Sequence, residues 1–127
     1  MRVLSILVVL VLTGCTSLAM NRHLNAAYEA YAQGDCPKVM SELSQAERKS
    51  RPRPWLQPEI SLLRGQCLER QKLYVDAVET YRFIDTRYPG SEYAYRARAR
   101  LETLRQLGLD GSAAVPQAQP VRSPVRP

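Results

Sequence analysis

Small residues recur at a regular spacing in the middle of the chain, and this spacing limits the fold more than any other feature. Within residues 58–89, Gly65 and Ala77 stand where two successive helices can approach closely. Pro89 and Gly90 end the second helix, because the residue before a proline disfavours helix and glycine tolerates a turn. The larger apolar residues that would fill the space between these helices are Leu68, Tyr81 and Ile84.

An earlier stretch, residues 20–53, carries a second copy of the pattern. Gly34 and Asp35 fall at the turn between its two helices, where Asp35 can cap the helix that follows. A third half-unit begins at Ser91, a plausible N-cap, and Gly108 closes it as a C-cap. The helices predicted in this way are 20–33, 37–49, 58–71, 75–87 and 92–107.

This spacing resembles the tetratricopeptide repeat (TPR), a helix–turn–helix unit of about 34 residues. The resemblance covers residues 20–107 and implies an all-α fold, a short TPR-like helical-hairpin solenoid of about two and a half repeats. Ser61 and Arg64 depart from the family, which usually has Trp and Leu there. A generic helical-hairpin domain without superhelical register is the alternative. So short a solenoid leaves a disulfide, a partner or self-association to supplement its stability.

Residues 1–14 have the composition of a targeting segment. Arg2 is followed by an apolar run over residues 3–12 that one serine interrupts. A helix of about ten residues rises only about 15 Å, half the thickness of a bilayer core, so this run is too short to span a membrane stably. A positive charge, a short apolar stretch and then small residues are typical of a secretory signal peptide.

The next residues, Leu12-Thr13-Gly14-Cys15, resemble the lipobox of bacterial lipoproteins. The resemblance implies cleavage before Cys15 and acylation of its thiol and freed amine, with 15–19 as a lipidated N-terminus. Each buried CH₂ contributes about 0.8 kcal/mol, so several acyl chains would anchor the protein firmly. Thr16 stands where Asp would signal inner-membrane retention, which implies the outer membrane, facing the periplasm. An ordinary signal peptide followed by an unrelated cysteine is the alternative.

The positive charge takes a different meaning in that compartment. Lys and Arg number 18 against 12 Asp and Glu, a formal net charge of +6, which in a cytosolic protein would suggest nucleic acid. Periplasmic anions are instead lipid head groups, lipopolysaccharide phosphates, peptidoglycan carboxylates and acidic protein patches. The sequence has no basic patch interleaved with aromatic residues, so nucleic-acid binding is not expected. Residues 108–127 are rich in proline, which predicts a flexible tail.

Two cysteines remain once Cys15 is assigned to the anchor. Cys36 and Cys67 would lie on neighbouring helices of the stacked repeats, in an oxidising compartment. We therefore expect one disulfide, worth roughly 3–4 kcal/mol in the chain-entropy model. Two buried free thiols are the alternative. His23 is the single histidine and no C-x-x-C spacing occurs, so no metal site or cofactor is expected.

Repeat solenoids bind partners on a concave face that the first helix of each repeat lines. The TPR resemblance implies a mixed aromatic and polar surface there, which suits a peptide better than a small molecule. For Tyr28 and Tyr31, packing between helices is the alternative. The candidate partner-binding residues are Asn21, Leu24, Tyr28, Tyr31, Glu59, Leu62, Gln66, Glu69, Arg70, Tyr93, Arg96 and Arg100.

Basic residues gather in two further places, along the last predicted helix and in the connector between the two repeats. A solvated surface, with long side-chain stems covering apolar packing, is the simpler interpretation, and an anionic partner is the other. Trp55 at the end of the connector either anchors an interface or folds back over the gap between the repeats. The second of these is favoured.

These features together predict a non-catalytic periplasmic adaptor or scaffold that binds protein, accessory to an envelope machine for barrel assembly, secretion or cell-wall synthesis. A regulatory lipoprotein that modulates an inner-membrane sensor kinase or a cell-wall enzyme is the alternative. The sequence has no Ser/His/Asp set, paired-carboxylate motif or phosphate-binding loop, so an enzyme is not expected. The predicted partners are envelope proteins, with the membrane reached through the lipid anchor.

Overall fold

The computed structural model describes residues 2–51 and 53–112, with side chains from Ser17 onward. Helices and turns make up these ranges, which hold no strand, so the predicted all-α fold is confirmed. A single turn of 3-10 helix, η1, links the second and third α-helices. The elements are α1 (Arg2–Ala32), α2 (Cys36–Ser50), η1 (Pro54–Leu56), α3 (Gln57–Arg70), α4 (Tyr74–Arg87) and α5 (Glu92–Gln106).

The ends of α2 to α5 agree with the predicted helices to within one residue, but the start of α1 does not. α1 runs without a break from Arg2, so the start predicted at residue 20 is wrong for the chain as it stands. The stretch ahead of residue 20 is apolar and contains no proline, so nothing local ends the helix there. Most of the predicted tail, 113–127, lies outside the described residues.

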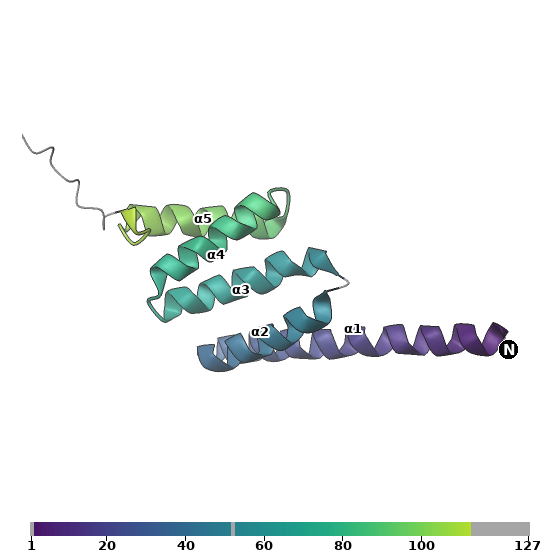
Figure 1. Ribbon diagram of the computed structural model, residues 1–127. Helices are drawn as coiled ribbons and strands as arrows, with labels where there is room; N and C mark the ends of the chain where they lie inside the picture. Colours follow the sequence, from purple (N-terminus) through teal and green to yellow (C-terminus); the bar gives the residue numbers. More distant parts are fainter. Residues whose placement is uncertain (1, 52, 113–127) are drawn as a thin grey trace, which may run out of the picture.

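The helices stack in chain order, with α1 and α2 at one end and α4 and α5 at the other (Figure 1). Each helix packs against the next, which gives hairpins of α1 with α2 and of α3 with α4. In addition, α3 contacts both α1 and α5. The first helices of the units, α1, α3 and α5, therefore form one layer, as a stack of helical hairpins requires.

Two apolar clusters hold the stack together, and α3 contributes to both. Ile60 and Leu63 pack into the cluster with α1 and α2, whereas Leu62 and Leu68 pack into the cluster with α4 and α5. Gly65 lies against the ring of Tyr81, which is fully buried. The close approach of α3 and α4 at Gly65 was predicted from the small residue there and is confirmed.

The first helix of each unit ends in the same kind of turn. Gly34, Lys72 and Gly108 follow α1, α3 and α5 with φ of +78°, +62° and +68°. The residue after each one donates its backbone N–H to a carbonyl five residues earlier, which is the hydrogen bond of a Schellman C-cap. These bonds are Asp35 N to Ala30 O at 2.9 Å, Leu73 N to Leu68 O at 2.9 Å and Leu109 N to Leu104 O at 2.8 Å.

Lys72 stands at a position that favours glycine, so Lys72→Gly should stabilise the protein. A residue with a side chain loses about 1–2 kcal/mol in the left-handed region, and glycine avoids this cost but loses more chain entropy. We expect the free energy of unfolding to rise by about 0.5–1 kcal/mol, measured by urea unfolding. Lys38→Gly, a control within α2, should instead lower it by about 1 kcal/mol. A lower unfolding midpoint for Lys72→Gly would contradict this account.

Side-chain caps fix the starts of two helices as predicted. Asp35 Oδ1 accepts from the Lys38 backbone N–H at 3.0 Å, at the start of α2. Ser91 Oγ accepts from the Ala94 backbone N–H at 3.1 Å, at the start of α5. Each cap satisfies a backbone donor that the first turn of a helix leaves open.

The connector between the two hairpins differs from its prediction at one residue. Trp55 is 65% exposed, so the favoured interpretation, that it folds back over the gap between repeats, is wrong. It lies in η1, which opens with Pro54 and forms a short 3-10 turn rather than a continuation of α2. The indole is therefore left on the surface.

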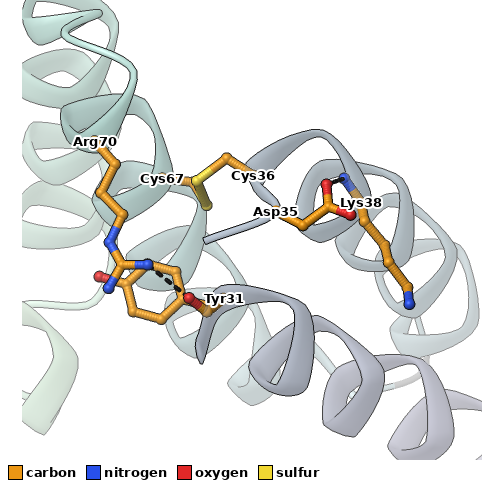
Figure 2. The surroundings of a disulfide bond; sticks show 6 residues. All are labelled: Tyr31, Asp35, Cys36, Lys38, Cys67 and Arg70. Atoms are coloured by element: carbon orange, nitrogen blue, oxygen red, sulfur yellow. Dashed lines mark hydrogen bonds between the residues drawn. A yellow bond between two sulfur atoms is a disulfide. The ribbon is translucent and has the colours of Figure 1, made fainter. Parts of the chain in front are cut away.

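A disulfide joins the two hairpins. Cys36 at the start of α2 and Cys67 in α3 are bonded with their Cα atoms 5.5 Å apart, and both side chains are buried (Figure 2). That separation is within the usual range for a disulfide. The pairing expected from the sequence therefore fits the geometry of the fold.

Candidate functional site

A hollow of about 430 Å³ opens on the layer formed by α1, α3 and α5. Its wall includes five of the residues predicted for the concave face, together with Tyr74 at the start of α4 and leucines at the end of α5 and just after it. Helix ends therefore meet here, which brings charged and apolar groups together. The lining residues are Tyr31, Gln66, Glu69, Arg70, Tyr74, Arg100, Leu104, Leu107 and Leu109.

Arg70 is held against the end of α1. Its guanidinium lies 3.6 Å from the centre of the Tyr31 ring, and Nη1 donates to the Tyr31 carbonyl oxygen at 2.6 Å (Figure 2). No carboxylate among the described residues lies within ion-pair distance of Arg70. A stacked guanidinium keeps donors free on its edge, so Arg70 can receive an anionic group from outside.

Arg100 is arranged differently, because Glu69 neutralises it. Nε donates to Glu69 Oε2 at 2.9 Å and Nη2 to Oε1 at 2.6 Å, a bidentate pair that links α5 to α3. The Tyr81 hydroxyl donates to Oε2 of the same carboxylate at 2.6 Å. Glu69 therefore binds three helices together at the floor of the hollow, a more structural role than the predicted one.

The pKa of Glu69 follows from these contacts. Burial alone would raise the pKa of the carboxyl, but the hydrogen bonds from Arg100 and Tyr81 and the Arg100 charge hold it below its ordinary value. The pKa of Tyr81 is raised, first by burial and then by its bond to the Glu69 carboxylate. At neutral pH the Glu69 carboxylate is therefore ionised, and it is held by the neutral Tyr81 hydroxyl and the Arg100 guanidinium.

Acid should weaken the fold through Glu69. A carboxyl with a lowered folded-state pKa contributes stability above its unfolded pKa of about 4.3, and this is lost as pH falls through the folded pKa. We expect urea midpoints of the wild type to fall between pH 5 and pH 3 more than those of Glu69→Gln, which starts lower at pH 7. Glu79→Gln, which removes an exposed carboxylate of α4, should keep the wild-type acid loss. Equal losses in wild type and Glu69→Gln would contradict the assignment.

A second polar group lies at the other end of the same layer. The Tyr28 hydroxyl donates to Glu59 Oε1 at 2.8 Å, which links α1 to α3, and Tyr28 is 42% exposed. Burial, followed by the hydrogen bond and charge of Glu59, raises the pKa of Tyr28. Arg96 places its guanidinium 5.9 Å from the centre of the Tyr93 ring, on α5. Tyr28 thus links two helices through its hydroxyl and also exposes part of its side chain to solvent.

The assignment of two residues to an exposed binding face is wrong. Leu24 and Leu62 are 7% and 4% exposed and belong to the apolar clusters on either side of α3. The repeat pattern assigns both to the same helix face as the binding residues, but side chains of the neighbouring helices cover both positions. Asn21 is exposed but lines a separate shallow depression of α1, with Leu18 and Arg22 among its neighbours.

Four residues of the hollow were not identified from the sequence. Tyr74 opens α4, Leu104 lies in the last turn of α5, and Leu107 and Leu109 follow that helix around Gly108. The repeat pattern takes binding positions from the first helices only, so it omits Tyr74 in α4 and the two leucines after α5, and Leu104 is not among the positions it counts. The sequence Leu107-Gly108-Leu109 after a helix is the signal that could have identified the two leucines. A Schellman turn at Gly108 brings the apolar residue that follows it back onto the end of the helix.

The arginines of α5 prove to be paired rather than free. Arg96, Arg98, Arg100 and Arg105 each lie within 3.3 Å of a carboxylate oxygen. The partners are Glu92, Asp85, Glu69 and Glu102, all on α3, α4 or α5 itself. The basic character of this helix is therefore balanced locally, which favours the solvated-surface interpretation over an anionic partner for α5.

Other chemistry of the described side chains is limited. His23 Nδ1 lies 2.7 Å from Glu42 Oε2, a contact between α1 and α2. Among residues 17–51 and 53–112 no three His, Cys, Asp or Glu side chains gather in a way that could hold a metal ion. Over the same residues, no helix has both the length and the apolar character to cross a membrane.

What the arrangement offers is a recess with one guanidinium free to bind, one that is neutralised, two aromatic rings and three leucines. Such a surface suits a peptide with an acidic group beside apolar side chains. Comparison with known proteins adds no relative, since no protein-family model, no curated protein and no solved structure matches this chain.

Proposed function

We propose that this protein is an outer-membrane lipoprotein that acts as a non-catalytic adaptor in the periplasm. The observation that carries the proposal is the hollow on the α1, α3 and α5 layer, where Tyr31 and Arg70 present a stacked guanidinium beside Leu107 and Leu109. A groove of this size accepts one short segment of a partner, extended or helical. The partner class is an envelope protein of a machine for barrel assembly, secretion or cell-wall synthesis.

The mode of binding follows from the lining. Arg70 would bind a carboxylate of the partner through donors that Tyr31 does not use. The leucines and Tyr74 would cover apolar side chains next to that carboxylate. The half-buried pair of Glu69 and Arg100 would keep the floor rigid, so little ordering is needed on binding.

The anchor is the second part of the proposal. Leu12-Thr13-Gly14-Cys15 supports lipidation at Cys15 with removal of residues 1–14. Acylation would hold the adaptor at a surface and so raise the local concentration of its binding face. Cys15→Ser should leave the protein unprocessed and without acyl chains, as measured by intact mass. An acylated product from Cys15→Ser would refute the assignment.

A photo-crosslinking residue placed at Gln66 tests the adaptor role. Gln66 lines the hollow, whereas Thr80 on α4 does not and is the matched control site. We expect crosslinks to a defined envelope protein from position 66 and not from position 80, and Arg70→Gln should weaken them at least about tenfold. Recovery of barrel-assembly, secretion or wall-synthesis components supports the adaptor. Recovery of a single sensor kinase or hydrolase would favour the regulatory alternative, and identical capture from both sites would contradict a binding face.

A further inference from the structure

Four cations that form no ion pair with a described residue lie at one corner of the molecule. Arg48, Lys49, Arg51 and Arg53 lie at the end of α2 and in the connector, and within the described ranges none of them forms an ion pair. The arginines of α5 contrast with them, since each has a carboxylate. Arg22, Lys38, Arg70, Lys72 and Arg87 also lack an ion pair among the described residues, but only here do four such cations fall within six positions of the chain. We call this place the basic corner and add to it two exposed apolar residues: Trp55, two positions after Arg53, and Leu18, which directly follows Ser17, the residue that Arg53 contacts.

Among the described side chains of α1, α2 and the connector, the two apolar members of the basic corner are the most exposed large apolar ones. Trp55 is 65% exposed and Leu18 is 74% exposed. Tryptophan beside lysine and arginine is the combination that proteins place at a membrane–water interface, where the ring enters the head-group layer and the cations meet phosphates. A merely solvated surface would not need the indole.

Position connects the basic corner to the anchor. The Arg53 guanidinium donates to Ser17 Oγ, which joins the connector to the beginning of the described side chains of α1. Ser17 is only two positions after Cys15 in the sequence. Acyl chains on Cys15 would therefore hold Ser17, and the Arg53 side chain that contacts it, near the bilayer surface, because two residues span at most about 7 Å.

We propose that the basic corner docks on a bilayer surface that carries anionic phospholipid head groups. Arg48, Lys49 and Arg51 would bind lipid phosphates, while Trp55 and Leu18 would enter the boundary between head groups and acyl chains. This proposal rests on the lipidation proposed above and adds a second contact to it. Two contacts fix how the domain stands on the membrane, whereas a lipid chain on a flexible end would not.

The chain carries its own probe for this contact, because Trp55 is its single tryptophan. The lipidated protein is reconstituted into vesicles of phosphatidylcholine, alone or with phosphatidylglycerol, and Trp55 emission is recorded. With phosphatidylglycerol we expect a shift to shorter wavelength and strong quenching by brominated acyl chains. Raising the salt from 0.15 M to about 0.5 M should reduce both effects, because screening weakens attraction between exposed charges.

Paired variants separate the basic corner from general charge. Each cation near an anionic surface is worth about 1 kcal/mol, about fivefold in an equilibrium, so Arg48→Gln with Arg51→Gln should lower the docked-to-undocked ratio by about tenfold or more. Arg82→Gln with Arg105→Gln removes the same charge from paired arginines elsewhere and should change the ratio less than about twofold.

Several results would overturn the proposal. They are equal quenching in phosphatidylcholine alone, equal effects of the two double variants, or Trp55 emission that stays unshifted on acylated, vesicle-bound protein. Trp55 that becomes shielded only when an envelope protein is added would assign the basic corner to a protein interface instead. Intact mass separates a failure of the proposed lipid anchor from a failure of the docking. Missing acyl chains would refute the anchor and this docking with it. Acylated protein in which Trp55 stays unquenched would refute the docking alone.

Discussion

Reducing the Cys36–Cys67 disulfide is expected to lower the free energy of unfolding by about 3–4 kcal/mol. The bond closes a loop with a sequence separation of 31 residues, and the chain-entropy model assigns a cost of this size to opening it in the unfolded state. The effect should be large because the fold is small and rests on two modest apolar clusters. Urea unfolding with and without reductant measures it directly.

The double variant Cys36→Ser with Cys67→Ser serves as the control for reductant. It should unfold at the midpoint of the reduced wild type and should not respond to reductant at all. Alkylation under unfolding conditions supplies an independent count of thiols. Two alkylated thiols in protein that was never reduced, or the same unfolding midpoint with and without reductant, would show that the disulfide contributes nothing.

Tyr81→Ala should cost about 3–5 kcal/mol, which is the other large effect. Tyr81 is the largest of the fully buried side chains, and its ring fills the space over Gly65 between α3 and α4. Tyr81→Phe keeps the ring but removes the donor to Glu69, so we expect it to lose only about 1–2 kcal/mol. A loss from Tyr81→Ala no larger than that from Tyr81→Phe would contradict the packing account.

The contact with Gly65 gives this prediction a sharper test. A Cβ at position 65 would lie 2.5 Å from Tyr81 Cε1, so Gly65→Ala should lower stability by about 1–3 kcal/mol despite the better helix propensity of alanine. In the Tyr81→Ala background the clash is gone, and the same substitution should become neutral or stabilising. A double-mutant cycle measures this coupling, and additive effects would rule it out.

The parts of the fold that could be predicted are those that local chemistry decides. The caps Asp35 and Ser91 and the C-cap Gly108 each satisfy backbone groups within a few residues, so they can be identified without knowing the tertiary structure. Gly65 was predictable for a related reason, because a small residue inside a helix implies a close neighbour. Lys72 was not, since its side chain gives no sign of a left-handed turn.

The candidate site was predictable only in part, because it depends on how far the stack extends. The repeat pattern assigned Tyr31, Gln66 and Arg70 to one face, and all three line the hollow, whereas Leu24 and Leu62 carry the same periodicity and are buried. Periodicity identifies which face a residue shares but not whether a neighbouring hairpin covers that face. The hollow is completed by Leu107 and Leu109, which lie beyond the last helix, where a pattern based on helices ends.

The described ranges contain an odd number of α-helices, and this gives the molecule a direction. Successive helices run in opposite directions. The start of α1 and the end of α5 therefore lie on opposite sides of the molecule along the direction of the helix axes (Figure 1). A helix of the length of α5, 15 residues, spans about 22 Å. With its N-terminus held at a membrane, the domain would become a spacer that places the C-terminal end of α5 on the far side, roughly one helix length above the lipid surface. Adding or removing one helix would bring the end of the last helix back toward the bilayer.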